Sequence, residues 1–174
     1  MMREAIRAFD YAERILKALP EGILLNTMDE KFNSMVIGWG QMGILWGQPT
    51  FTVYVRQSRY TKPALDRTRE FTVSVPLEGE LSREVFRICG RQSGRETDKA
   101  KAAGLTLAGA EKINTPGIKE VPLTLECRVL YQQDQVLEYL PEELRERMYG
   151  REGNAGDFHT TYVGQIVSAY IIRE

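Results

Sequence analysis

The sequence has 174 residues, 43% of them hydrophobic, and its 23 Lys and Arg residues are balanced by 24 Asp and Glu. A chain of this length can bury roughly 70% of its unfolded surface, so we expect one domain over residues 1–174. Near-neutral charge gives no general field for nucleic acid or an anionic membrane, and we expect neither as a partner. Any anion must be bound by a local cluster of side chains.

The scarcity of Cys and His excludes several classes of site. Cys89 and Cys127 lie far apart and lack Cys-x-x-Cys spacing, which argues against a disulfide framework or a zinc site and favours two buried thiols. His159 is the sole histidine, so a multi-histidine metal centre is excluded and we expect no metal. Charged residues interrupt the first ten positions, which speaks against a signal peptide or a membrane span. We expect a cytoplasmic protein.

Helical periodicity predicts several short helices. The first spans residues 4–19 and is stopped by Pro20, and we expect this N-terminal segment, residues 1–20, to pack on one end of a barrel. Thr61 is expected to cap the second helix. The later helices are expected at residues 61–67, 81–89, 98–103 and 141–149.

Alternating apolar and polar residues predict strands between these helices. The alternation is clearest in residues 50–56, whose odd-numbered positions form one buried face. Residues 121–133 and 135–139 are expected to pair with each other around Asp134. Further strands are expected at residues 22–28, 32–39, 70–75 and 161–172. Because helices and strands do not alternate regularly, the order favours a mainly β fold, a small barrel with flanking short helices.

The strand that runs from Asn33 to Gly40 reads Asn-Ser-Met-Val-Ile-Gly-Trp-Gly. It loses its side chains at Gly38 and Gly40, where a flat group could press directly on the backbone. Asn33 and the amides of the next two residues could then meet the polar edge of such a ring. The alternative is a core strand with a β-bulge at the glycines.

The second stretch, Val-Arg-Gln-Ser-Arg-Tyr-Thr at residues 55–61, gathers Arg56, Ser58, Arg59 and Thr61 at a strand end. Guanidinium groups, hydroxyls and the amides of a helix start are the groups that bind a phosphate monoester. The alternative is a solvated turn whose arginines face water. Together, the two stretches predict a pocket for a planar ring that carries a phosphate.

These two stretches and a third, His-Thr-Thr-Tyr-Val-Gly at residues 159–164, are similar in order and spacing to the flavin reductase-like family. Its members hold FMN in a split β-barrel, and the likeness covers nearly the whole chain. The resemblance implies an FMN-binding split β-barrel with flanking short helices and a homodimer with flavin near the subunit interface. It also implies hydride transfer from NADH or NADPH to flavin, in which the protein supplies orientation and electrostatics.

The resemblance assigns roles to two further residues. It brings Lys99, at the end of a loop that starts at Ser93, close to the phosphate or the ribityl chain of FMN. It brings His159 near the reactive side of the flavin, to steady negative charge or to position the nicotinamide. The alternatives are a capping box of Ser93 with Glu96 and a structural histidine. The expected flavin-binding residues are Asn33, Ser34, Met35, Val36, Gly38, Trp39, Arg56, Ser58, Arg59, Thr61 and Lys99, and the expected catalytic residue is His159.

Two other functions fit the same motifs. One is a flavin-bearing electron carrier that accepts electrons from a redox protein, because the family includes such members. The other is a non-catalytic flavin-binding or sensing module. The sequence has no nicotinamide fingerprint that would separate these functions from the enzyme, because the GxGxxG letters at residues 38–43 open no helix.

Overall fold

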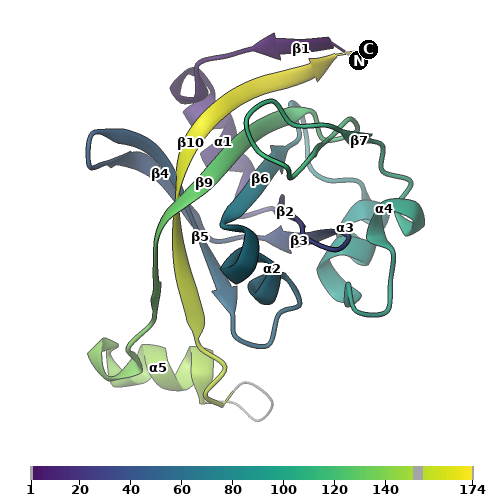
Figure 1. Ribbon diagram of the computed structural model, residues 1–174. Helices are drawn as coiled ribbons and strands as arrows, with labels where there is room; N and C mark the ends of the chain where they lie inside the picture. The colour runs from purple at the N-terminus through teal and green to yellow at the C-terminus, as the bar shows by residue number, and fades with distance from the viewer. Residues whose placement is uncertain (1, 151–154, 174) are drawn as a thin grey trace.

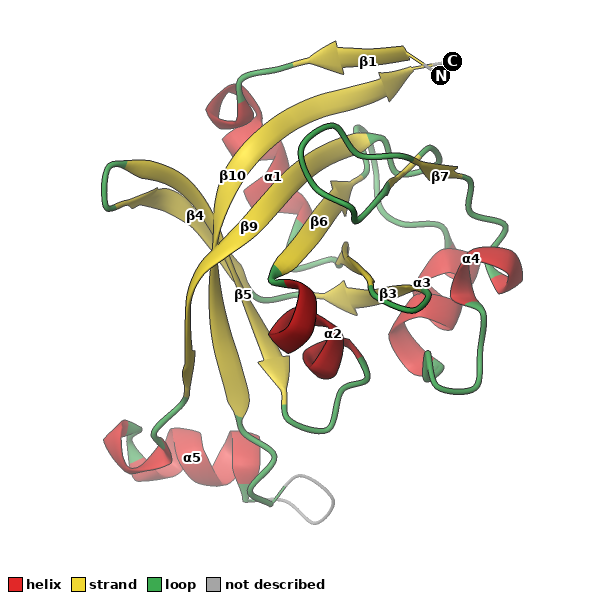
Figure 2. Ribbon diagram, viewed as in Figure 1, coloured by secondary structure: helices red, strands yellow, loops and turns green. Residues whose placement is uncertain are grey.

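The computed structural model describes residues 2–150 and 155–173, and within them eight strands pair into one strongly bent antiparallel sheet (Figures 1 and 2). The strand order is β3-β2-β6-β9-β10-β5-β4, and β1 pairs with the end of β10. The bounds are β1 Met2–Ala5, β2 Ile23–Met28, β3 Phe32–Ile37, β4 Gly40–Leu45, β5 Gln48–Arg56, β6 Glu70–Val75, β9 Leu123–Asp134 and β10 His159–Arg173, with a separate pair β7 Leu107–Ala108 and β8 Gly117–Ile118.

Short helices flank this sheet, as Figure 2 shows. Their bounds are α1 Ala12–Ala18, α2 Thr61–Thr68, α3 Arg83–Arg91, α4 Lys99–Ala102 and α5 Glu142–Tyr149, with 3-10 turns at Ala8–Tyr11 and Leu137–Tyr139. Ser82 starts α3 by accepting a hydrogen bond from the Val85 amide, and Asp98 starts α4 in the same way from Lys101. The predicted mainly β fold with flanking short helices is confirmed.

The longest strand, β10, holds the two halves of the sheet together. One of its edges pairs with β9, and the other pairs first with β5 and then with β1. In this register His159 lies opposite Arg56. The start of β10 and the end of β5 therefore lie at one end of the sheet, where the chain turns into α2.

The main core lies inside the bend of the sheet. Phe51, Val53 and Val55 are fully buried there, which confirms the predicted face of β5. α1 closes the core with Ile15. A second cluster packs α3 and α4 on the outer side of β2, and Cys89 belongs to it. Cys89 and Cys127 are both buried and unpaired with each other, as predicted.

The structure differs from the sequence analysis of the elements in three places. The N-terminal helix expected over residues 4–19 forms only as α1, because Met2–Ala5 pairs with the free edge of β10. Residues 135–139 form no strand, since β9 pairs with β6 and with the distant β10 instead. Most of the expected loop at residues 150–156 lies outside the described part of the chain.

The third difference is β4, which the sequence did not predict as a strand. It forms a hairpin with β5 through a two-residue turn, in which Trp46 has a φ of 52° and Gly47 a φ of 70°. Two consecutive positive φ angles match the twist of a β-hairpin, but a tryptophan is unusual there.

No helix in the described ranges could cross a membrane.

Gly164 on β10 provides a test of the packing. An added Cβ would lie 2.5 Å from Phe71 Cζ and 2.9 Å from Cys127 Cβ, so Gly164→Ala should destabilise the fold by about 1–3 kcal/mol through overpacking. Gly43→Ala is the matched control, since no atom lies within 4 Å of its added Cβ. Urea denaturation should show a lower midpoint for Gly164→Ala alone. Equal midpoints for the two variants would contradict the packing described for β10.

Candidate functional site

Two adjoining cavities of about 210 Å³ each lie where β3 meets the β5–α2 turn and the loop between α3 and α4. Both are lined by Met35, Val36 and Arg59. Together they fall within the range of roughly 300–1,000 Å³ typical of small-molecule sites. The first, which we call the basic cavity, is further lined by Asn33, Ser58, Tyr60, Thr61, residues 89–95 and Lys99. The second, which we call the aromatic cavity, is further lined by Ile37, Gly38, Trp39, Tyr54, Arg56, Met148 and His159.

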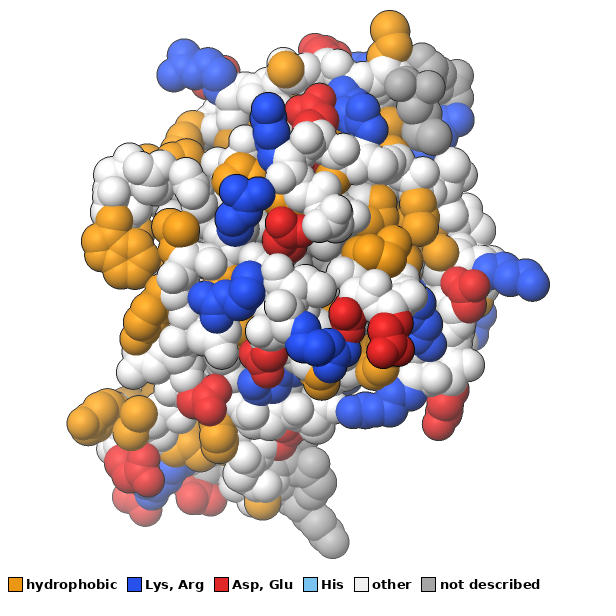
Figure 3. All heavy atoms as spheres, in the orientation of Figure 1, with side chains coloured by type: hydrophobic (Ala, Val, Ile, Leu, Met, Phe, Trp, Pro, Cys, Tyr) orange, Lys and Arg blue, Asp and Glu red, His pale blue; other side chains and the backbone are white. Residues whose placement is uncertain are grey.

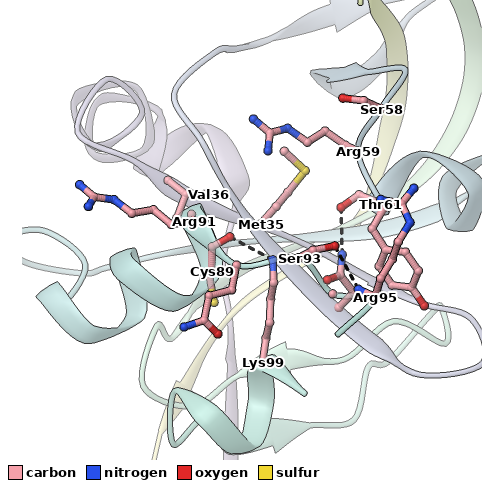
Figure 4. Close-up of a pocket in the computed structure, with 15 residues that line it drawn as sticks. Met35, Val36, Ser58, Arg59, Thr61, Cys89, Arg91, Ser93, Arg95 and Lys99 are labelled. Carbon is pink, nitrogen blue, oxygen red and sulfur yellow. Dashed lines mark hydrogen bonds between the residues drawn. The ribbon is translucent and has the colours of Figure 1, made fainter. Parts of the chain in front are cut away.

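A buried hydrogen bond joins β3 to the start of α2 beneath the basic cavity (Figure 4). Asn33 Nδ2 donates to Thr61 Oγ1 at 2.9 Å. Thr61 is therefore not the N-cap that the sequence predicted, because the helix begins at Thr61 and its cap is Tyr60. Asn33 Oδ1 is buried and has no partner among the described residues. This strand edge thus has an acceptor still available beside the cavity.

The loop over Asn33 requires a glycine that the sequence analysis did not single out. An added Cβ at Gly94 would lie 2.2 Å from Asn33 Oδ1 and 2.6 Å from the Tyr60 ring. Ser93, next to it, accepts a hydrogen bond from the Arg95 amide, while Asp98 caps α4. The capping box of Ser93 with Glu96 is therefore wrong, since Ser93 shapes the loop instead.

Positive charge is concentrated in the basic cavity. Arg59, Arg91, Arg95 and Lys99 line it, and among the residues that the structure describes no Asp or Glu does. In the part of the chain that the structure describes, no carboxylate forms a salt bridge with the three arginines. Because the whole chain has a net charge of -1, an anion must be bound by a local cluster of positive side chains, and the basic cavity holds such a cluster.

Lys99 forms the floor of the basic cavity. Only 4% of it is exposed, and its Nζ donates to the carbonyl of Ser34 at 2.7 Å and to that of Cys89 at 3.1 Å (Figure 4). Burial lowers the pKa of this ammonium; the Cys89 thiol opposes the shift and the charge of Arg59 adds to it. Lys99 thus ties β3 to the end of α3 and keeps a positive charge under the cavity.

Two of the four residues predicted to bind phosphate, Arg56 and Ser58, are hydrogen-bonded to Asp157. Ser58 is held by Asp157, to which its hydroxyl donates at 2.7 Å and its amide at 2.9 Å. Arg56 donates to the Asp157 carbonyl at 2.8 Å and lies over the Tyr149 ring. Arg56 therefore borders the aromatic cavity, whereas the Arg59 side chain extends between the two cavities, and its guanidinium forms no hydrogen bond with a described residue.

The remaining strand residues also differ in position. Met35, Val36 and Gly38 line a cavity, but Ser34 lines neither, and its buried hydroxyl has no partner among the described residues. Gly40 belongs to β4, where an added Cβ would lie 3.1 Å from Phe51 and from the Thr52 carbonyl. Its lack of a side chain therefore serves strand packing and not a ligand.

His159 is fixed from two sides at the aromatic cavity. Its ring lies 5.0 Å from that of Trp39, and its Nδ1 is 2.7 Å from the Tyr149 hydroxyl. Tyr149 donates its one proton to Gln135 Oε1 at 2.7 Å, so it accepts from His159 Nδ1–H. This assignment leaves His159 Nε2 as an unprotonated acceptor. The sequence singled out neither Tyr149 nor Gln135, since both belong to the segment before β10.

The charge state of His159 follows from its surroundings. Its pKa is lowered to about 4, chiefly by burial and also by the charges of Arg56 and Arg59, while Asp157 opposes the shift. The ring is therefore neutral near pH 7. A neutral ring has no charge with which to steady an anion.

Within the described ranges, no group of three or more His, Cys, Asp and Glu side chains could hold a metal ion. The candidate site consists of the basic and aromatic cavities. Their lining combines an apolar and aromatic surface with a cationic end. That combination suits an organic ring bearing an anionic group.

The chain belongs to the flavin reductase-like family. The family model described as "Flavin reductase like domain" matches residues 16–174. An uncharacterized protein of Archaeoglobus fulgidus is 31% identical over 138 residues, which are 79% of this chain and 64% of that protein. The chain thus spans less than two thirds of the length of that relative.

Solved structures agree with this family. Flavoredoxin from Methanosarcina acetivorans is similar with a TM-score of 0.63 and 26% identity, over 87% of this chain and 68% of that one. The NADH:FAD oxidoreductase of Streptomyces globisporus has the same fold with a TM-score of 0.65 and 15% identity, over 99% of this chain and 88% of that one. Membership in the family supports flavin binding.

The lowered pKa of His159 predicts a pH dependence of stability. Between pH 6.5 and about pH 4 the unfolded chain binds a proton at this histidine that the folded chain does not, so acidification across this window should lower the free energy of unfolding. His159→Gln removes this contribution and should lose less stability across the window than the wild type. Urea titrations of both proteins at each end of the window measure the difference. Parallel losses would show that His159 titrates normally in the folded state.

Proposed function

We propose that this chain binds FMN and promotes hydride transfer from NADH or NADPH to the flavin. The observation that carries the proposal is the junction of the two cavities at Met35, Val36 and Arg59. One side of the junction is aromatic and the other is cationic, and FMN has the same two parts, a planar ring and a phosphate. When bound, the flavin would supply the acceptor for two electrons and a proton, and the nicotinamide would leave in oxidised form.

The residues of the basic cavity fit the phosphate end. The Arg59 guanidinium has no hydrogen-bond partner among the described residues, and the amide of Thr61, the first residue of the eight-residue helix α2, lies beside it. The buried charge of Lys99 adds attraction for an anion. The side chain of Asn33 and the backbone of β3 would meet the polar parts of the ligand. Ser58 would contribute only if its hydrogen bonds to Asp157 rearranged.

The aromatic cavity fits the ring end. Met35 and Val36 of β3 offer strand backbone and apolar side chains along one wall, which continues as bare backbone at Gly38, and Trp39 with His159 forms another. Neutral His159 would orient the nicotinamide, because its free Nε2 can accept a hydrogen bond from a carboxamide. Tyr149 would hold the ring in that orientation.

We further propose that the protein is a homodimer, as the family resemblance implies. Ile44, Leu45 and Trp46 are exposed at the β4–β5 turn, and Figure 3 shows hydrophobic side chains gathered at this hairpin. Trp46 also contacts Tyr131 of β9, next to exposed Leu130. Large apolar surfaces of this kind are costly in water, and a second copy of the chain would cover them.

The similarity to a flavoredoxin favours an alternative, an FMN electron carrier reduced by a redox protein. Stopped-flow reduction of the FMN-loaded protein separates the two functions. Rapid bleaching of the flavin absorbance by NADH or NADPH would support the enzyme. Negligible reduction by both nucleotides would favour the carrier.

Arg59 should select ligands that carry a phosphate. A charge-assisted hydrogen bond contributes about 1.5–3 kcal/mol, so Arg59→Ala should weaken FMN roughly tenfold to a hundredfold. Riboflavin lacks the phosphate, and its affinity should change little. Calorimetric titration of both ligands measures the contrast, with Arg83→Ala as a control on an exposed arginine outside both cavities. Equal weakening of FMN and riboflavin would assign Arg59 to folding or to ring contacts.

His159 should control reduction and not flavin affinity. A displacement of the reacting atoms by about 1 Å can cost on the order of a hundredfold in rate, so His159→Ala should slow single-turnover reduction by NAD(P)H while FMN affinity stays nearly constant. Tyr149→Phe keeps an aromatic ring against His159 but removes the hydroxyl at Nδ1, and it should slow reduction less. An unchanged rate per bound flavin in His159→Ala would leave the histidine a purely structural role.

A further inference from the structure

Asp157, which precedes β10, binds both hydrogen-bond donors of Ser58. Its Oδ1 accepts from the Ser58 amide at 2.9 Å, and its Oδ2 accepts from the Ser58 hydroxyl at 2.7 Å. One anion thus takes both donors, and each donor meets a different oxygen. Two oxygens of a phosphate would bind the same amide and hydroxyl in the same way. The Asp157 carboxylate therefore occupies part of the proposed phosphate site.

The neighbouring Arg59 is not occupied in this way. Its guanidinium forms no salt bridge with a carboxylate of the described residues. Figure 4 shows Ser58 and Arg59 next to each other on one side of the basic cavity. An incoming phosphate can therefore meet Arg59 at once, but it must displace the Asp157 carboxylate to reach Ser58. Because both groups are anions, they also repel each other at this short range.

The main chain around Asp157 is anchored independently of its carboxylate. Arg56 Nη1 donates to the Asp157 carbonyl at 2.8 Å, and the Gln57 amide donates to the Phe158 carbonyl at 3.1 Å. Both bonds can persist when the Asp157 side chain rotates away from Ser58. Asp157 is only half-buried, so the rotated carboxylate regains contact with water. Displacement thus requires a side-chain rotation and no rearrangement of β5 or β10.

We infer that Asp157 is an internal competitor of the phosphate, which binds Ser58 in the flavin-free protein and leaves it when FMN binds. This inference rests on the proposed function of the same site. It makes Asp157 a determinant of ligand selection, because only a flavin with a phosphate has to displace the carboxylate and gains the Ser58 donors in return. Riboflavin binds with the hydrogen bonds between Asp157 and Ser58 intact.

Calorimetric titration of FMN and riboflavin into the flavin-free full chain tests this inference. The variants are Asp157→Asn, Asp157→Ala, Ser58→Ala and the double variant Ser58→Ala/Asp157→Ala. Glu138→Gln is the control, because it removes one exposed carboxylate outside both cavities. Asp157→Asn keeps the size of the side chain, and thermal melting of each variant establishes that it is folded.

Removal of the Asp157 carboxylate should tighten FMN binding roughly threefold to tenfold, the effect expected when a competing hydrogen bond is relieved. Riboflavin affinity and the control variant should be unchanged. In the wild-type background Ser58→Ala removes a bond to Asp157 as well as one to phosphate, so FMN affinity should change little. In the Asp157→Ala background it removes only the bond to phosphate and should weaken FMN roughly threefold or more.

Three results would overturn the inference. One is FMN affinity that is unchanged or weaker in folded Asp157→Asn and Asp157→Ala, which would leave Asp157 a purely structural role. Another is equal tightening of FMN and riboflavin. The third is an equal effect of Ser58→Ala in both backgrounds, because the carboxylate and the phosphate would then not share Ser58. A folded wild type that binds neither flavin would instead overturn the proposed function.

Discussion

The register of β10 against β5 is the constraint on which the site depends. Because His159 lies opposite Arg56, the histidine, the β5–α2 turn and Arg59 share one end of the sheet. A slip of one residue would turn every side chain of β10 to the other face, and His159 would leave the aromatic cavity. Main-chain pairing with β9 on the other edge holds this register, so the position of the histidine is a consequence of the sheet and not of a flexible loop.

Burial gives the two ends of the site different electrostatic properties. At the basic end, Lys99 stays hydrogen-bonded to two carbonyls, and its positive charge lies close enough to Arg59 for the two charges to interact. At the aromatic end, the same desolvation and the nearby Arg56 keep His159 neutral. The site therefore attracts an anion at one end and offers an uncharged acceptor at the other, although the chain as a whole is almost neutral.

Local sequence patterns predicted the elements that are governed by local physics. Strand β6 has the predicted bounds, and the buried face of β5 follows from alternation. Long-range contacts explain what was missed. The hairpin turn at Trp46 and the close approach of Gly94 to Asn33 have no local signature, because each depends on a partner strand or loop. Arg59 was predicted for the site, but its separation from Arg56 depends on Asp157, about a hundred residues away in sequence.

The central claim is that the two adjoining cavities form one flavin site. Calorimetric titration of FMN into flavin-free protein measures this most directly, with circular dichroism to establish that the protein is folded. We expect saturation at about one FMN per chain, because the described structure contains one such pair of cavities. Folded protein that takes up no FMN would contradict the account.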